Sequence, residues 1–382
     1  MLASPRRSTP RTSEMIPAAE LPAFQSRLLA WFAGAKRDLD WRRTSDPYHV
    51  WISEIMLQQT RVATVLPYYR RFLTQFPSVD ALARARPDVV LRYWAGLGYY
   101  SRARNLHRAA KEIVAQHEGN FPKRLEEALA LPGIGPYTAA AVLSIAYGEP
   151  HAVLDGNVAR VLARLGAIRG ELRQPITWRE LADAANALLP AQGTHDAGPG
   201  DWNQAMMELG ATLCTPRAPQ CGGCPVARWC RAHTLGIAGV LPSARKKRQP
   251  ISLALSAAVL LDARGRTLVL RQKGDHGILF SSLWQFPAIQ ASRPDARKLA
   301  RYLQSVFGVS AELQPLPPAR HTVTFRKILL APFLVRVRKL PAPRRSTMGG
   351  VRKPVLSELE RLPISSATQK IAAAALAALA AS

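Results

Sequence analysis

The stretch LPGIGPY (Leu131–Tyr137) joins two segments whose apolar residues recur at helical spacing. Gly133 and Gly135 permit a tight turn with exposed backbone N–H groups, and Pro136 suits the first turn of the following helix. The pattern predicts two helices connected by a hairpin, whose N–H groups and helix N-terminus together attract an anion. A plain αα-turn, in which the glycines only allow close packing, is the alternative interpretation.

Helical patterns extend on both sides of this hairpin, from Leu21 to about Thr234, and no strand-like alternation of any length interrupts them. The pair Asp46-Pro47 predicts a helix start, with Asp46 as the N-cap. Further helices are expected at Asp88–Ala95, Ser101–Gln116, Leu125–Ala130, Pro136–Tyr147, Val158–Leu165, Trp178–Leu188 and Trp202–Leu213. Residues 21–235 are therefore predicted to form an all-α domain.

The residues that flank this domain have a different composition. Residues 1–20 are basic and lack an apolar core, so we expect a disordered arm, and the Gly-, Pro- and Arg-containing residues 236–250 predict an exposed linker. Residues 251–382 mix strand-like and helical runs, which predicts an α+β domain. The strand-like runs are ISLALSAAVLL, TLVLRQ and HTVTFRKILLAPFLVRV, and the helical ones are Asp295–Phe307 and Ser357–Ala381.

The chain is strongly basic. Lys and Arg total 52 against 26 Asp and Glu, a formal net charge of +26. Residues 251–382 hold 20 basic and 6 acidic side chains, +14, which leaves +12 for residues 1–250. Both halves thus attract a polyanion: nucleic acid, an anionic membrane surface or an acidic protein. No run of eighteen apolar residues occurs, so we expect no membrane span.

All four cysteines fall in one short segment, at Cys214, Cys221, Cys224 and Cys230. A secreted disulfide scaffold spreads its cysteines, so the clustering predicts a metal site in a reducing compartment. Four thiolates with uneven spacing and a single C-x-x-C pair fit a cubane 4Fe–4S cluster. A zinc site in which His233 replaces one cysteine is the alternative.

Five motifs, in this order, resemble the MutY-type adenine DNA glycosylases of the helix-hairpin-helix iron–sulfur superfamily. They are SEIMLQQTRV, WAGLGYYSRARNL, LPGIGPYTAAAV, VLDGNVARVLARL and WNQAMMELGATLC, followed by the four cysteines. The resemblance covers Leu21–Thr234 and implies base excision repair, in which adenine mispaired with 8-oxoguanine or guanine is removed from duplex DNA. The endonuclease III enzymes share the hairpin and the cluster.

The resemblance implies a pair of catalytic carboxylates. Glu54 matches the family's catalytic acid, which protonates adenine N7. Its apolar neighbours Trp51, Ile55 and Leu57 favour the protonated form that such an acid needs. Asp155 matches the second carboxylate, an anion that stabilises the oxocarbenium-like transition state at the sugar. From the residues alone, a solvent-facing Glu54 and an Asp155 that is only an N-cap are the alternatives.

Tyr137 and Asn157 match positions that line the family's catalytic pocket. In the bifunctional glycosylase/lyases the position of Tyr137 is a Lys, whose amine forms a Schiff base with the sugar. A phenol cannot do this, the hairpin contains no Lys, and Ala159 stands where some relatives carry one. We therefore expect a monofunctional glycosylase, with an endonuclease III-like lyase as the alternative.

The resemblance also implies which residues contact the base and the DNA. Four of them resemble residues around the flipped adenine: Arg37, Leu39, Trp41 and Gln204. Gln59 and Tyr99 resemble side chains that wedge into the duplex beside the lesion, although core packing is the alternative for Tyr99. Leu131, Gly133 and Gly135 of the hairpin are expected to bind backbone phosphate.

Residues 251–382 resemble the family's Nudix-like domain, which faces 8-oxoguanine on the opposite strand. LFSSLWQFP (Leu279–Pro287) resembles a Gly-Leu-Trp-Glu-Phe-Pro segment of that domain, with Gln285 where Glu is usual. Asp and Glu are scarce in this region, so we expect no magnesium-dependent pyrophosphatase chemistry.

The expected lesion-recognition loop departs from the family pattern His-Thr-Phe-Ser-His. His321, Thr322 and Thr324 match or approximate three of its positions, whereas Phe325 replaces the second His, a hydrogen-bond donor. We therefore expect a weaker preference for 8-oxoguanine over guanine opposite adenine.

The expected partner is double-stranded DNA, bound by a monomer that is cytoplasmic and associated with the nucleoid. A third interpretation is a non-enzymatic zinc or iron–sulfur DNA-binding protein, in which Glu54 and Asp155 are merely structural.

Overall fold

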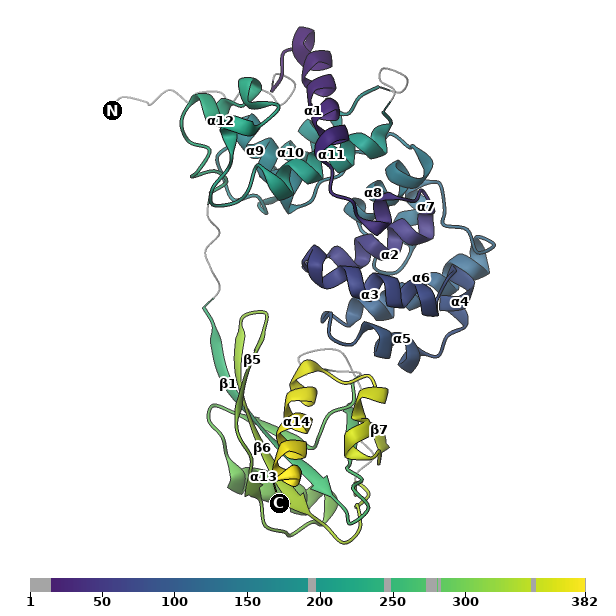
Figure 1. Ribbon diagram of the computed structural model, residues 1–382, viewed down its shortest axis with the longest axis vertical. Helices are drawn as coiled ribbons and strands as arrows, with labels where there is room; N and C mark the ends of the chain where they lie inside the picture. The colour runs from purple at the N-terminus through teal and green to yellow at the C-terminus, as the bar shows by residue number, and fades with distance from the viewer. Residues whose placement is uncertain are drawn as a thin grey trace, which may run out of the picture. The chain divides into compact units, whose positions relative to one another are not determined.

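The computed structural model describes residues 15–191, 197–243, 249–272, 280, 283–344 and 348–381 (Figure 1). By its contacts the chain divides into two compact units. Unit 1 comprises Met1–Arg84 and Asn105–Lys246, and unit 2 comprises Ala85–Arg104 and Lys247–Ser382. The segment Ala85–Arg104, which the helical pattern places in the first domain, therefore groups with the C-terminal part.

Unit 1 is helical in its described residues. Its helices are α1 (Leu21–Ala35), α2 (Pro47–Leu57), α3 (Val62–Gln75), α4 (Val79–Arg84), α6 (Ser101–Gln116, which begins in unit 2), α7 (Leu125–Ala130), α8 (Pro136–Tyr147), α9 (Gly156–Leu165), α10 (Pro175–Leu188), α11 (Pro199–Thr212) and α12 (Arg231–Thr234). Short 3-10 turns occur at Ala18–Glu20, Asp40–Arg42, Cys221–Gly223 and Ala227–Trp229. Asp46 caps α2 as predicted, with its side chain accepting from the backbone N–H groups of Tyr48 and His49.

The predicted hairpin joins α7 to α8. Gly133 has a φ of +80°, and a Cβ at this position would lie 2.6 Å from the Cβ of Asn105 on α6. Gly135 is the N-cap of α8, and Pro136 is its first residue. The turn therefore depends on a left-handed backbone and on close approach to α6, two conditions that glycine meets without strain.

Helix α9 lies at the centre of the main core of unit 1. Its eight consecutive residues Val158–Leu165 are all buried. They pack with apolar residues of α1, α8, α10 and α11 in one cluster. Two of the eight are arginines, Arg160 and Arg164, so this helix brings charge as well as apolar surface into the interior.

Unit 2 is an α+β unit. Its elements are α5 (Pro87–Trp94), β1 (Ile251–Leu261), β2 (Val269–Gln272), β3 (Ala288–Ala291), α13 (Ala296–Phe307), β4 (Gln314–Pro315), β5 (Ala319–Val323), β6 (Arg326–Arg336), β7 (Met348–Arg352), a 3-10 helix (Leu356–Arg361) and α14 (Ser366–Ala380). β1 pairs parallel with β6 and antiparallel with β3, while β4 and β5 each pair antiparallel with β6. β2 and β7 form a separate antiparallel ribbon.

Each face of the main sheet has its own core. Alternate residues of a strand face opposite sides, and β1 is apolar on both. Ala257, Val259 and Leu261 pack in a cluster with α14, whereas Ala258 and Leu260 pack in a cluster with α13. The run ISLALSAAVLL is thus apolar at most positions of both faces, because helices cover both. The predicted class, an all-α domain followed by an α+β domain, is confirmed.

Two predicted elements are each divided into two in the structure. The helix expected at Ser357–Ala381 is a 3-10 helix followed by α14, because Pro363 between them cannot continue a helix. The long strand-like run that begins at His321 is a hairpin, in which β5 ends at Val323 and Thr324 turns with a φ of +55°.

The expected arm and linker also differ where they are described. Residues 1–14 and 244–248 lie outside the described residues. Met15 and Ile16 are buried in the core of unit 1, so the arm expected to be disordered contributes apolar surface to the fold. Ala238 and Leu241, expected in an exposed linker, are buried beside the cysteine loop, where Leu241 accepts a hydrogen bond from Arg164.

Within the described residues, no helix combines the length and the apolar character that crossing a bilayer requires.

Replacing Gly133 with Ala tests the hairpin. The left-handed backbone costs about 1–2 kcal/mol with a side chain, and the clash with Asn105 adds to it, so Gly133→Ala should lower the melting temperature by several degrees. Gly135→Ala is the matched control, because a Cβ there meets nothing within 4 Å. Thermal unfolding followed by circular dichroism measures both; equal shifts in the two variants would contradict this account.

Candidate active site

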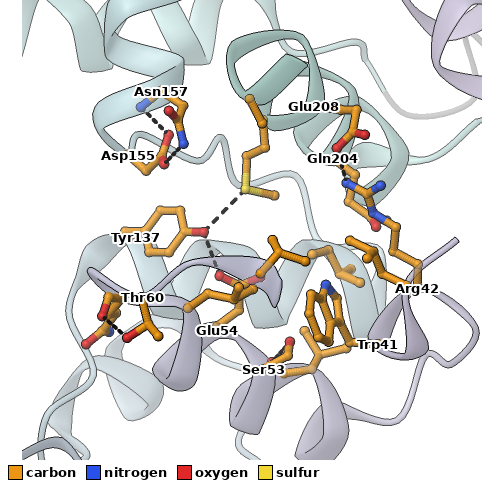
Figure 2. A pocket seen from close by; sticks show the side chains of 18 of the residues that line it. Trp41, Arg42, Ser53, Glu54, Thr60, Tyr137, Asp155, Asn157, Gln204 and Glu208 are labelled. Atoms are coloured by element: carbon orange, nitrogen blue, oxygen red, sulfur yellow. Dashed lines mark hydrogen bonds and ion pairs between the residues drawn. The ribbon is translucent and has the colours of Figure 1, made fainter. Parts of the chain in front are cut away.

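A cavity of about 480 Å³ opens into unit 1 between α2, α8, the start of α9 and α11. Its volume lies in the range of about 300–1,000 Å³ that small-ligand pockets occupy. Figure 2 shows the side chains that converge on it, with Glu54, Tyr137 and Asp155 among them. Two carboxyl groups that lie 101 positions apart in the chain therefore face one space.

Glu54 is buried, with 5% of its surface exposed. Helix α2 places it among Trp51, Ile52 and Ile55, which are also buried. Burial raises the pKa of Glu54 to about 7, and the charge of Asp155 adds to this rise, while the Tyr137 hydrogen bond and Arg42 oppose it. The carboxyl group therefore holds a proton up to neutral pH.

Tyr137 fixes the orientation of this carboxyl group. It is the second residue of α8, directly after the hairpin, and its hydroxyl donates to Glu54 Oε2 at 2.6 Å (Figure 2). The same hydroxyl lies 3.3 Å from Met207 Sδ. Burial raises the pKa of Tyr137 well above its usual range, so the phenol stays a donor. With Oε2 accepting this bond, Oε1 is the oxygen that can carry the proton of Glu54.

Asp155 is both an N-cap and a wall of the cavity. Its Oδ1 accepts from the backbone N–H groups of Asn157 at 2.9 Å and Val158 at 2.8 Å, and its Oδ2 accepts from Asn157 Nδ2 at 3.0 Å. Burial raises the pKa of Asp155, whereas these bonds and the charge of Arg160 lower it. The cap holds the carboxylate in place, and the N-terminus of α9 favours its negative charge.

All four residues predicted to surround the adenine line this cavity: Arg37, Leu39, Trp41 and Gln204. Gln59 lines it as well. Leu39 and Trp41 are buried and give the cavity an apolar, aromatic side. Gln59, two residues after the end of α2, has a φ of +57°, a conformation that non-glycine residues rarely adopt without a functional or structural reason.

An ion-pair cluster that sequence reasoning missed forms another wall. Glu208 on α11 has no exposed side-chain surface and accepts hydrogen bonds from Arg37 and Arg42 at 2.7 and 2.8 Å. Burial by itself would raise the pKa of Glu208, but the two guanidinium groups outweigh it and lower the pKa to about 2. Glu208 is therefore an anion in the same cavity in which Glu54 is protonated. An acidic residue within the mostly apolar run WNQAMMELGAT was the available signal.

The four cysteines line one small cavity of unit 1, beside Arg164 and His233. All are free and partly buried. Arg164 donates to Cys214 Sγ at 3.2 Å and to the carbonyl oxygen of Thr215 at 2.8 Å. In the described part of the chain, no three His, Cys, Asp or Glu side chains are arranged to hold a metal ion.

A second cavity, of about 410 Å³, lies within unit 2. Tyr99 lines it together with His321, Thr322 and Thr324, so one of the two predicted wedge residues shares a space with the predicted lesion loop, whereas Gln59 lines the first cavity. Tyr99 is 41% exposed, which excludes core packing. Tyr99, Thr324 and Phe280 in this lining all have a positive φ, between +48° and +60°.

The hairpin residues predicted to bind phosphate lie on neither cavity. Leu131 is buried at the end of α7, and Gly133 and Gly135 form the turn into α8.

Comparison with known proteins agrees with this geometry. The profile of the HhH-GPD superfamily of base excision DNA repair proteins matches residues 52–185, and that of the iron–sulfur binding domain of endonuclease III matches residues 214–230. The chain is 33% identical to the adenine DNA glycosylase of Rattus norvegicus, over 92% of this chain and 78% of the relative. It is 37% identical to the adenine DNA glycosylase of Homo sapiens, over 71% of this chain and 58% of the relative.

The chain belongs to the adenine DNA glycosylase family. It is a base excision repair protein with an iron–sulfur binding domain. Among solved structures, a thermostable thymine-DNA glycosylase is 28% identical, with a TM-score of 0.51 over 57% of this chain and 98% of the other. The chain spans 42–59% of the length of several other adenine DNA glycosylases that it matches.

The cysteine cavity of the glycosylase fits an iron–sulfur cluster. Burial raises the pKa of Cys224 to about 11 and also raises that of Cys230, so these thiols need a cationic centre to become thiolates. An iron–sulfur cluster, when bound, would supply that charge to the four cysteines that line this cavity. Cys214, Cys221, Cys224 and Cys230 would hold the cluster.

Hydrogen bonds connect the cysteine loop of the glycosylase to its pocket. Arg160, buried on α9, donates through Nη2 to Asn157 Oδ1 at 2.9 Å and through Nε to the carbonyl oxygen of Cys214 at 2.8 Å. Asn157 in turn donates to Asp155. Helix α11 can approach Asn157 closely because Gly210 has no side chain; a Cβ at that position would lie 2.8 Å from the Cβ of Asn157. Order in the cysteine loop therefore supports the position of Asp155.

Removing one cysteine tests the metal site. Cys224→Ala should lose most of the bound iron and acid-labile sulfide, and its melting temperature should fall, because a ligand that binds only the folded state stabilises it. Iron analysis and thermal unfolding measure this. His233→Ala is the control, since the zinc alternative needs that side chain and a four-cysteine cluster does not. Stoichiometric zinc without iron in the wild type would contradict the assignment.

Proposed function

We propose that this glycosylase hydrolyses the N-glycosidic bond of adenine mispaired with 8-oxoguanine or guanine in duplex DNA. The observation that carries the proposal is the pair of carboxyl groups facing one cavity, with Glu54 protonated at neutral pH and Asp155 held by three hydrogen bonds. Adenine must leave the base stack to enter the cavity, at a cost of a few kcal/mol.

The two carboxyl groups have different roles in bond cleavage. Glu54 gives its proton to adenine N7 as the bond from N9 to the sugar C1′ breaks, and the electron pair leaves with the neutral base. Asp155 stabilises the positive charge that develops on the sugar. A water molecule then adds to C1′, and its proton returns to the Glu54 carboxylate, which regenerates the enzyme.

Three other side chains would recognise the flipped base. With N7 facing Glu54, the Watson–Crick edge of adenine still presents an acceptor at N1 and a donor at its exocyclic amine. Arg37 and Arg42 supply N–H donors at the cavity wall, and the ionised Glu208 supplies acceptor oxygens. Because each guanidinium is held by Glu208, the donors are oriented before the base arrives.

The enzyme would be monofunctional. Among the described residues that line the cavity of unit 1 there is no lysine, and Tyr137 occupies the position after the hairpin. A Schiff base with the sugar needs an uncharged amine within reach. The strand should therefore keep its backbone intact, with an abasic site.

The cavity of unit 2 would recognise 8-oxoguanine. His321, Thr322 and Thr324 supply polar groups to it, and Tyr99 supplies an aromatic ring. Phe325 cannot donate a hydrogen bond, so the preference for 8-oxoguanine over guanine should be weaker than two histidines would give. The excess of arginine suits phosphate contacts along the duplex, bound by a monomer at the nucleoid.

The proposed chemistry predicts the products and the effect of one substitution. On a duplex with adenine opposite 8-oxoguanine, mass analysis of both strands should show free adenine and an unbroken abasic strand. Glu54→Gln should bind this duplex but excise at least about 100-fold more slowly, the usual contribution of a general acid. Glu126→Gln, on a side chain 76% exposed, should match the wild type. A strand nicked through a borohydride-trapped imine would contradict the monofunctional assignment.

The pKa of Glu54 predicts the pH dependence. Only the protonated acid is active, and its pKa in the folded protein is raised to about 7. The single-turnover rate constant should thus fall as pH rises through this value, by about tenfold per pH unit beyond it. Binding of the same duplex, measured by fluorescence anisotropy over the same range, separates this from loss of affinity. A rate that increases with pH would contradict Glu54 as the acid.

A further inference from the structure

The ribbon of β2 and β7 in unit 2 carries two arginines on one face. In the antiparallel register Val269 lies opposite Arg352 and Arg271 lies opposite Gly350, so the two arginines are diagonal neighbours on the same side. Both stack on the buried ring of Trp284, with guanidinium carbons 4.9 and 4.8 Å from the ring centre. Gly350 allows this approach, because a Cβ there would lie 3.0 Å from Trp284 Cη2.

Asp88 of α5 forms an ion pair with each of these two arginines. Its Oδ1 lies 2.6 Å from Arg271 Nη1, and its Oδ2 lies 3.1 Å from Arg352 Nη2. The Asp88 side chain is 19% exposed, so both bonds are partly shielded from water. One carboxylate therefore pairs with both guanidinium groups and offsets one of their two charges, a geometry more favourable than that of an isolated surface ion pair.

Helix α5 carries the loop that contains Tyr99. Trp94 Nε1, at the end of α5, donates to the carbonyl oxygen of Gly98 at 3.1 Å. The guanidinium of Arg102 lies 5.4 Å from the ring centres of both Trp94 and Tyr99, and it donates to Gly98 as well. These contacts join the loop to the helix, so the position of α5 determines the position of Tyr99.

We propose that Asp88 is a positioning residue for lesion recognition. By binding Arg271 and Arg352 it fixes α5 against the β2–β7 ribbon of the same unit. This places Tyr99 where it shares a cavity with the loop of His321 and Thr324. Without the carboxylate, the two guanidinium groups repel each other and α5 loses its attachment. The inference rests on the proposed function only in its consequence for 8-oxoguanine.

Asp88→Asn tests the proposal at two levels. Hydrogen exchange of residues 95–100 in the free protein should become faster, because the loop is less firmly held. The ratio of single-turnover rate constants, adenine opposite 8-oxoguanine over adenine opposite guanine, should fall at least about fivefold. Excision opposite guanine should stay within about twofold of the wild type, because the cavity of Glu54 lies in unit 1 and is intact.

Two further variants complete the experiment. Asp88→Glu keeps the carboxylate and should restore both exchange and ratio. Glu358→Gln, which removes an exposed ion pair with Arg361 at 2.8 Å in the same unit, should change neither. Unchanged exchange in Asp88→Asn, or faster exchange with an unchanged ratio, would overturn the proposal. A wild type that excises no adenine from either duplex would instead refute the proposed function, while the exchange data would still decide whether Asp88 holds the loop.

Discussion

The burial of one carboxyl group, Glu54, constrains the rest of the active site. An ionised carboxylate without a partner is costly in an apolar interior, so the group takes up a proton and accepts one strong hydrogen bond from Tyr137. Tyr137 reaches Glu54 because the hairpin ends at Gly135 and α8 begins at Pro136, which makes Tyr137 the second residue of that helix. The fold of the hairpin and the protonation of the acid are thus parts of one arrangement.

Carboxylates in this chain behave differently according to what surrounds them. Glu54 has no guanidinium within hydrogen-bonding distance among its described contacts and holds a proton, whereas Glu208, equally buried, stays ionised between Arg37 and Arg42. Asp155 lies between these cases, with burial opposed by an N-cap and a neighbouring amide. One cavity therefore holds three carboxyl groups whose surroundings push their pKa values apart, a condition that acid–base chemistry requires.

Backbone strain is concentrated at the two cavities. Of the six non-glycine residues with positive φ among the described residues, Gln59 lines the first cavity and three others, Tyr99, Phe280 and Thr324, line the second. Such conformations persist only where surrounding structure enforces them. In unit 2 that enforcement includes the Trp94 and Arg102 contacts of the Tyr99 loop, which is why a cavity lined by loops can still be well defined.

The sequence by itself determined the features that depend on near neighbours: most helices of unit 1, the Asp46 cap, the hairpin glycines and the clustered cysteines. Only the tertiary structure decided that Glu208 faces the cavity of unit 1 and that segment 85–104 belongs with the C-terminal unit. Glu208 is bound by Arg37 and Arg42, and Asp88 of the segment is bound by Arg271 and Arg352. All four arginines lie far along the chain from the carboxylate that they bind. Caps and periodicity act over a few residues, whereas burial and ion pairing depend on which distant segments the fold brings together.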